Sequence, residues 1–219
     1  MNNNEMHVVS PELFLSNTQH FNALMMMYRS TIREIRTKLE VLDDEFSIKY
    51  NRNPISSIKT RIKTPSSIYE KLKKMGFEFT EKNIREQLND VAGIRVICPF
   101  IDDIYTIANL ISDQDDITII RIKDYIMNPK PNGYRSYHMI VEIPIFFAEG
   151  KTPMRAAIQI RTLAMDFWAS VEHQLRYKKN IGDPKQCEII SQELLKCAQT
   201  LTETDNQMQS IKKMIGELD

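Results

Sequence analysis

Several features that would identify common protein classes are missing from this sequence. Its three cysteines, Cys98, Cys187 and Cys197, are odd in number and form no CxxC pair, which argues against a disulfide framework and predicts a cytoplasmic protein. The four histidines have no zinc-ligand spacing. No run approaches the ~18 consecutive apolar residues of a membrane span, and residues 1–9 lack the basic start and apolar centre of a signal peptide.

The sequence also has no excess of positive or negative charge. Lys plus Arg and Asp plus Glu number 29 each among 219 residues, so composition indicates neither a nucleic-acid nor a membrane partner, and a basic site would have to be local. No repeat, low-complexity tract or long linker interrupts the chain. The length and the hydrophobic content of 42% predict one globular domain over residues 1–219.

The apolar periodicity predicts long helices near both ends. Steps of three and four from Phe21 to Phe46 indicate an amphipathic helix over 20–50. Its apolar stripe either packs on its own domain, which we favour, or pairs with another subunit. A similar pattern predicts a helix over 184–216. Between them, Thr64-Pro65 and Gly76 mark the start and the stop of a shorter helix.

The middle of the chain is dense in β-branched and aromatic residues. Strands are predicted at 93–99, 117–126, 137–147 and 156–161, with helices at 81–88, at 101–111 and from 162 to a break at 182–184. The expected fold is α+β, with a mixed sheet of about five strands flanked by helices. In the helix from 162, Phe167 and Trp168 are predicted to be core residues.

A basic cluster surrounds the start of the helix at Thr64. Arg61 and Lys63 precede it, and Ser67 and Lys71 share one face of its first turns. Because a helix N-terminus offers free N–H groups and a positive dipole end, this cluster suits phosphate. A solvated basic surface helix is the plainer alternative for this motif alone.

Asp90 and Arg95 flank the start of the first apolar strand. A carboxylate at a strand mouth can hold Mg²⁺ together with substrate phosphates. A planar guanidinium group can stack on a nucleobase or bind phosphate. The alternative is an Asp that caps a turn and pairs with the Arg.

The connection between the strands at 117–126 and 137–147 carries recognition-type side chains. Its prolines and Asn132-Gly133 predict an ordered turn. The turn brings one aromatic ring together with several cations, which favours nucleotide binding over an ordinary β-connection. These side chains are Lys130, Tyr134, Arg135 and His138.

The last predicted strand has one apolar and one polar face. Ile158 and Ile160 are expected to face the core. Ala157, Gln159 and Arg161 alternate with them, so they are presented toward whatever the sheet binds.

Together these stretches resemble the small alarmone synthetases, the single-domain relatives of the Rel/RelA stringent-response enzymes. The match runs from about Pro54 to Tyr177, through RIKTPSSIYEKLKK, DVAGIRV, NPKPNGYRSYH and IQIRTLAMDFWASVEH. The motifs KDYI, PKPNGY and MDFWAS most resemble those of the RelP subgroup. Ser57 and Asp166 stand where RelQ-like proteins tend to have Phe and Asn, which argues against the product activation of that subgroup.

The resemblance implies transfer of the β,γ-pyrophosphate of ATP to the ribose 3′-hydroxyl of GTP or GDP, with Mg²⁺, in a homotetramer. It divides the chain into a mobile start at 1–15, the N-terminal helix, a catalytic core over 54–177 and the C-terminal helix. By position, the resemblance assigns ATP binding to Arg61, Lys63, Ser67, Lys71 and Arg95. It assigns Mg²⁺ to Asp90, and the acceptor nucleotide to Lys130, Tyr134, Arg135, His138, Gln159, Arg161 and Glu172.

One position departs from the family pattern. Relatives read Glu-Ile-Gln-Ile-Arg where this chain has Ala157 at the first place, and that Glu is expected to hold Mg²⁺ and to accept the proton of the attacking hydroxyl. Glu142 and Asp166 are conceivable substitutes, but neither is in register. We therefore expect nucleotide binding with poor turnover. A non-catalytic nucleotide-binding regulator and a single-stranded RNA binder are the alternatives.

Overall fold

The structure is a computed structural model that describes residues 18–177 and 184–216. In chain order its elements are α2 (Thr18–Tyr50), β1 (Ser57–Ile62), α3 (Pro65–Met75), α4 (Glu81–Gln87), β2 (Ala92–Cys98), α5 (Ile101–Ser112), β3 (Thr118–Asp124), β4 (Tyr137–Phe147), β5 (Gly150–Thr162), α6 (Leu163–Tyr177) and α7 (Pro184–Gly216). The predicted mobile start and most of the predicted break at 182–184 lie outside the described residues.

The five strands form one mixed sheet in the order β1-β2-β5-β4-β3. Strands β2 and β5 run parallel, and every other neighbouring pair is antiparallel. The expected α+β fold and the four predicted strands are confirmed. Strand β1 was not predicted individually, because four of its six residues are exposed and Ile58 and Ile62 are its two apolar side chains.

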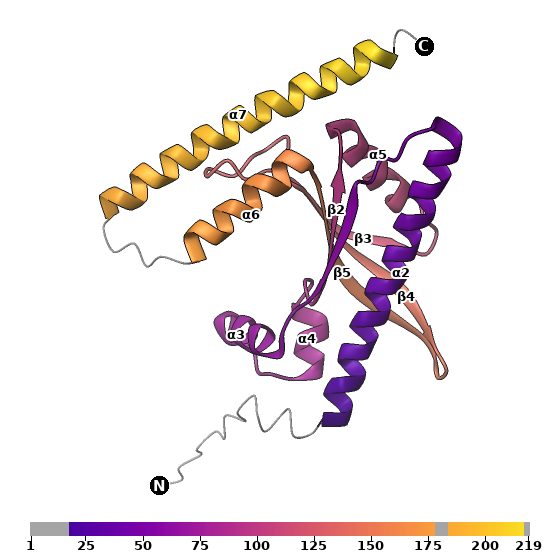
Figure 1. The fold of residues 1–219 in the computed structure, drawn as a ribbon. Coiled ribbons are helices and arrows are strands. Elements are labelled where there is room, and N and C mark those ends of the chain that lie inside the picture. The colour runs from indigo at the N-terminus through magenta and orange to yellow at the C-terminus, as the bar shows by residue number, and fades with distance from the viewer. Residues whose placement is uncertain (1–17, 178–183, 217–219) are drawn as a thin grey trace.

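Helices α2 and α5 cover one face of the sheet (Figure 1). The apolar stripe of α2 is buried against the strands, with Leu24, Ile35 and Leu39 at most 1% exposed. From the sheet, Ile94 and Ile158 point into the same core. The prediction that this helix packs on its own domain is therefore confirmed.

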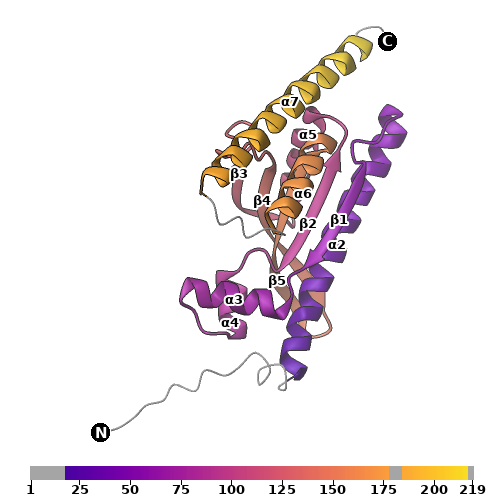
Figure 2. The same cartoon turned by 60° about the vertical axis from the view of Figure 1, so that its left-hand side comes forward.

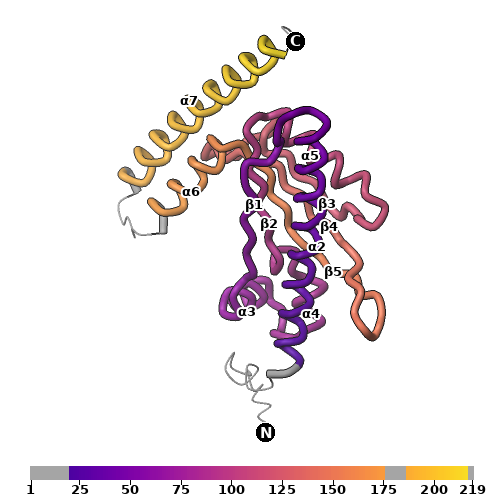
Figure 3. The backbone as a smooth tube through the Cα atoms, turned by 45° about the vertical axis from the view of Figure 1, so that its right-hand side comes forward, coloured from indigo at the N-terminus to yellow at the C-terminus, as the bar shows by residue number. Residues whose placement is uncertain are grey.

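Helices α6 and α7 lie on the side of the sheet away from α2, whereas α3 and α4 lie at the other end of the sheet, with α4 beside the N-terminal half of α2 (Figures 2 and 3). Helices α6 and α7 form a small second core around Trp168, whose indole N–H donates to the Leu194 carbonyl at 2.9 Å. Phe167 is 62% exposed, so its prediction as a core residue was wrong. Its neighbour Trp168 takes the inward position because consecutive helical residues point about 100° apart.

Helix α7 also covers the turn before β4. Gly133 has a φ of 85°, and a Cβ atom built on it would lie 2.5 Å from the Cβ of Ala198. The turn is closed by hydrogen bonds from Gly133 N to Lys130 O and from Lys130 N to Tyr134 O. The predicted ordered turn is confirmed, and α7 holds it from outside. Within the described part of the chain, no helix is long and apolar enough to span a membrane.

Candidate functional site

A cavity of ≈ 300 Å³ opens on the sheet face away from α2. Cross-strand register builds it, because Arg61, Gly93 and Ala157 form one row across β1, β2 and β5. The next row places Lys59, Arg95 and Gln159 side by side. The cavity lining is Lys59, Thr60, Arg61, Lys63, Asp90, Gly93, Ile94, Arg95, Ala157 and Gln159. Four cationic side chains against one carboxylate make this cavity a site for a polyanion.

The group of Lys63, Ser67, Lys71 and Asp90, here the Asp90 cluster, lies at the mouth of the cavity. Both lysine Nζ atoms lie 2.8 Å from the Asp90 carboxylate, Lys63 at Oδ2 and Lys71 at Oδ1. Burial opposes ionisation of Asp90, but the two ammonium groups outweigh it and hold its pKa below the usual value. Thr64 caps helix α3, its Oγ1 accepting from Ser67 N at 3.3 Å. The cluster thus joins a helix N-terminus with two cations, as the sequence predicted.

A second group, here the Tyr134 cluster, comprises Lys130, Tyr134, His138 and Arg161. Arg161 donates to the Tyr134 hydroxyl at 2.5 Å, and that hydroxyl lies 2.8 Å from Nε2 of His138. The ammonium group of Lys130 lies 4.8 Å from the centre of the Tyr134 ring. Arg161 is buried and also donates to Gln159 at 2.9 Å. Its donors are therefore engaged in holding neighbouring side chains in place.

His138 is electrically neutral in this cluster at neutral pH. Burial, supported by the nearby charges of Arg161, Lys130 and Lys123, lowers its pKa to about 4. A neutral imidazole can accept at Nε2 from the Tyr134 hydroxyl while that oxygen accepts from Arg161. The three side chains then form one directed series of hydrogen bonds.

Two of the expected acceptor-side residues lie apart from the Tyr134 cluster. Arg135 donates to Oγ1 of Thr202 in α7 at 3.1 Å, on the outer side of the turn. Glu172 in α6 accepts from the side-chain amide of Asn132 at 3.5 Å. Arg135 thus connects the end of the turn to α7, and Glu172 of α6 contacts the turn itself. Lys59, in contrast, lines the cavity but was not predicted. Its alternation with Arg61 in β1 and with Lys63 directly after the strand was the available signal.

The residues of the site could hold Mg²⁺ only together with phosphate ligands from a substrate. Within residues 18–177 and 184–216, no group of three or more His, Cys, Asp or Glu could hold a metal ion. Oδ1 of Asp90 is buried and lies within ion-pair distance of Lys71 without hydrogen-bond geometry. Mg²⁺ is commonly held by one or two carboxylates together with substrate phosphates. The site fits that arrangement, with the phosphates as necessary ligands.

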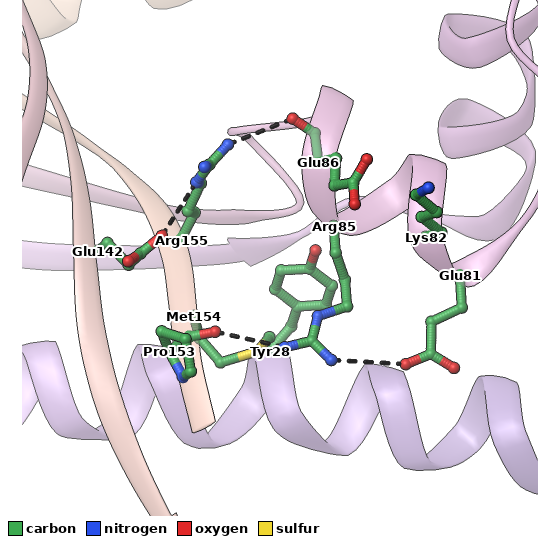
Figure 4. A pocket seen from close by; sticks show the side chains of 9 residues that line it. All are labelled: Tyr28, Glu81, Lys82, Arg85, Glu86, Glu142, Pro153, Met154 and Arg155. Atoms are coloured by element: carbon green, nitrogen blue, oxygen red, sulfur yellow. Dashed lines mark hydrogen bonds and ion pairs between the residues drawn. The ribbon is translucent and has the colours of Figure 1, made fainter. Parts of the chain in front are cut away.

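A larger cavity of ≈ 470 Å³ lies between α2, α4 and the β4–β5 hairpin (Figure 4). Its charged side chains are three bases and three acids, so it has no excess positive charge. They are Lys82, Arg85, Arg155, Glu81, Glu86 and Glu142. Arg155 is tied to Glu142 and to the Glu86 carbonyl, each at 3.2 Å. Size alone would select this cavity, but its charge does not suit a nucleotide polyphosphate.

Residues 60–182 match the region found in RelA / SpoT proteins. The chain is 41% identical over 191 residues to GTP pyrophosphokinase YwaC of Bacillus subtilis, covering 87% of this chain and 90% of that protein. It is 31% identical over 199 residues to GTP pyrophosphokinase YjbM of the same organism, covering 91% and 92%. The chain therefore belongs to the RelA/SpoT synthetase family.

Solved structures define its place in that family. Small alarmone synthetase 1 of Bacillus subtilis bound to its product pppGpp is 30% identical, with a TM-score of 0.79 over 90% of this chain and 98% of that one. The same synthetase bound to AMPCPP is 28% identical, with a TM-score of 0.74 over 91% and 99%. The protein is a small alarmone synthetase, and its higher identity to YwaC agrees with the RelP subgroup.

Proposed function

We propose that the protein transfers the β,γ-pyrophosphate of ATP to the 3′-hydroxyl of GTP or GDP, giving pppGpp or ppGpp and AMP. The observation that carries the proposal is one sheet face with two differently built anion sites, the Asp90 cluster and the Tyr134 cluster, on either side of Ala157 and Gln159. A transfer between two nucleotides requires two such sites close together. Family membership and the nucleotides bound in the small alarmone synthetase 1 structures support it.

The cavity and the Asp90 cluster would bind ATP. Arg61 and Arg95 project from neighbouring strands and can stack on the adenine from two sides. Lys63, Ser67 and Lys71 are near the N-terminus of α3, where phosphate is favoured. Bound between Asp90 and the phosphates, Mg²⁺ would neutralise negative charge on the transferred group.

The Tyr134 cluster would bind the acceptor. The Tyr134 ring can stack on guanine, with Lys130 beside the phosphates and His138, Gln159 and Arg161 fixing the ring's position. Arg135 and Glu172 would act on the acceptor only through the turn that they hold. In the reaction the 3′-hydroxyl loses its proton to water as its oxygen bonds to the β-phosphorus, and the bond from that phosphorus to the α,β-bridging oxygen breaks, so that AMP leaves with that oxygen.

Ala157 leaves the attacking hydroxyl without a carboxylate at the place in the cavity row where the resemblance to the family implies Glu. Asp90 is the one carboxylate in the cavity lining and is occupied by two lysines. We infer that this chain binds both nucleotides and turns over slowly. The same observation favours a second candidate, a regulator that binds the nucleotides and releases them unchanged.

The two candidates are separated by chromatography of products from labelled ATP incubated with GDP or GTP and Mg²⁺. We expect Ala157→Glu to raise ppGpp or pppGpp formation roughly 10²- to 10⁴-fold, the usual contribution of a positioned base. Ala157→Gln introduces a side chain of the same size as Glu but without a basic carboxylate, so its rate should be close to that of the parent. Equal rates in the Glu variant and the parent would contradict the assigned role of position 157.

We further propose that the chain acts as one domain in a cytoplasmic homotetramer. An exposed apolar stripe on α6 supports an assembly surface: Leu163, Phe167, Val171 and Leu175 are 38–62% exposed. Light scattering after size exclusion should report a tetramer for the parent and smaller species for Phe167→Ser. A Phe167→Ser protein that remains tetrameric would remove α6 from the interface.

A further inference from the structure

Asp166, in the first turns of α6, contacts cations from three strands. It is 6% exposed. Its Oδ2 accepts from Lys59 of β1 at 2.8 Å, and its Oδ1 lies 3.1 Å from Nη1 of Arg95 in β2. The same Oδ1 lies 3.3 Å from Nη1 of Arg161 in β5. One carboxylate oxygen is thus shared by two guanidinium groups.

These two guanidinium groups belong to different halves of the site. Arg95 lines the cavity, and its Nε is buried without a hydrogen-bond partner. Arg161 donates through its other N–H groups to the Tyr134 hydroxyl, which in turn is hydrogen-bonded to His138. Asp166 is therefore a direct connection between the cavity and the Tyr134 cluster, and it is the charged one, since Gln159, which also lines the cavity and accepts from Arg161, is neutral.

We propose that Asp166 is a positioning residue that couples the two nucleotide sites by holding Arg95 and Arg161 on one oxygen. The inference rests on the proposed function, because it assumes that the cavity and the Tyr134 cluster each bind one nucleotide. Because the oxygen is shared, a ligand that draws one guanidinium group away changes the contact of the other. Occupancy of one site then alters the affinity of the second.

The charge of Asp166 is essential to this role. Without it, the three cationic groups of Lys59, Arg95 and Arg161 would face one another around a buried amide, and like charges at such distances repel. Arg95, whose side chain is 37% exposed, can leave toward solvent. Arg161 is buried and cannot. Loss of the charge should therefore disturb both sites, the cavity through a displaced Arg95 and the Tyr134 cluster through a less well held Arg161.

The test measures binding by calorimetry with AMPCPP and GDP in Mg²⁺, which needs no turnover. In the parent, saturating GDP should change the AMPCPP dissociation constant by about fivefold, a usual size for coupling between sites. Asp166→Asn should weaken the binding of each nucleotide roughly 3- to 10-fold, as expected for loss of charge-assisted hydrogen bonds to cations that are partly exposed, Lys59 and Arg95. It should also bring the coupling factor close to one.

A matched control is Asp205→Asn. Asp205 is another buried carboxylate near the start of α6, where it accepts from Thr162 Oγ1 at 2.6 Å, and it contacts neither Arg95 nor Arg161 in the structure. A merely structural acid should lower the melting temperature and leave both affinities and the coupling unchanged, as we expect for Asp205→Asn.

The outcomes separate the two proposals. A parent that binds both nucleotides without coupling, or an Asp166→Asn protein that behaves like Asp205→Asn, overturns the role of Asp166 and leaves the proposed function standing. A parent that binds neither nucleotide overturns both.

Discussion

The Asp90 cluster and the Tyr134 cluster occupy the same sheet face but are held in place differently. In the Tyr134 cluster, Arg161 is buried, and its hydrogen bonds run in series through the Tyr134 hydroxyl to His138. In the Asp90 cluster, the Asp90 and Lys71 side chains are 37% and 40% exposed, and the lysines pair with the acid itself. The side chains of the Tyr134 cluster are thus held by protein contacts before any ligand binds. In the Asp90 cluster the opposite charges pair with one another, and a ligand can replace these pairs.

This difference predicts how each cluster responds to ligands. To bind here, phosphates would have to replace Asp90 as the partner of Lys63 and Lys71, and Mg²⁺ would have to replace the lysines as the partner of Asp90. Breaking such ion pairs costs little free energy where water screens the charges. A purine entering the Tyr134 cluster would meet side chains that are already oriented. We therefore expect the fold to depend on the Tyr134 cluster and its support, and to depend little on the Asp90 cluster.

The largest effect is expected where α7 meets the turn of the Tyr134 cluster. Gly133→Ala adds a methyl group 2.5 Å from the Cβ of Ala198, at a φ of 85° that L-residues rarely adopt. Overpacking and backbone strain together should lower the free energy of unfolding by about 3 kcal/mol. Urea denaturation measures this change, and GDP binding should weaken with it.

The control for this variant is Ala198→Gly in the Gly133→Ala background. It removes the clashing carbon but leaves the strained φ, so it should recover roughly half of the loss despite the poorer helix propensity of Gly. A double variant no more stable than Gly133→Ala would show that contact with α7 does not hold the turn.

The next effect concerns the pH dependence of the Tyr134 cluster. The pKa of His138 is about 4 in the folded chain, against an ordinary value of 6.5. Between these pH values the His138 imidazole is protonated in the unfolded chain and remains neutral in the folded chain. The contribution of His138 to stability is therefore complete above pH 6.5 and is lost as the pH falls to 4, by up to about 3 kcal/mol.

His138→Gln keeps a hydrogen-bond acceptor for the Tyr134 hydroxyl and removes the titration. Urea midpoints at pH 7.5, 6 and 5 should fall less steeply for this variant than for the parent. The lowered pKa values of Asp90 and Asp166 act below this window, so they leave the comparison unaffected. Parallel pH profiles for the two proteins would mean that His138 is accessible to water.

The sequence predicted the Asp90 cluster more completely than the Tyr134 cluster. The capping signals at Thr64 and Gly76 are local, and they placed the start and the stop of the helix correctly. The ion pairs of Asp90 with Lys63 and Lys71 were not predicted. Strand alternation likewise placed Ile158 and Ile160 inward and Gln159 outward. Interactions between neighbours along the chain could be predicted from the residues themselves.

Long-range contacts were the part that could not be predicted. That Arg135 donates to Thr202, or that Asp166 contacts Arg95, depends on how α6 and α7 lie over the sheet. The choice between Phe167 and Trp168 as the buried residue depends on the same packing. Apolar spacing predicts that a helix has a buried face, but a single-residue rotation exchanges two adjacent aromatic side chains between core and solvent.

The smallest change in stability is expected for Asp90→Asn, although it breaks two ion pairs of 2.8 Å. Because Asp90 and Lys71 are more than a third exposed and only Lys63, at 16%, is largely covered, the free energy of unfolding should change by only about 1 kcal/mol. The function of the position should nevertheless be lost: Mg²⁺ should no longer strengthen AMPCPP binding measured by calorimetry, while GDP binding stays as in the parent. If Asp90→Asn instead destabilised the chain as much as Gly133→Ala, the Asp90 cluster would be as much a part of the fold as the Tyr134 cluster. In that case the exchange of lysine for Mg²⁺ and phosphate would carry a structural cost that exposed ion pairs do not have.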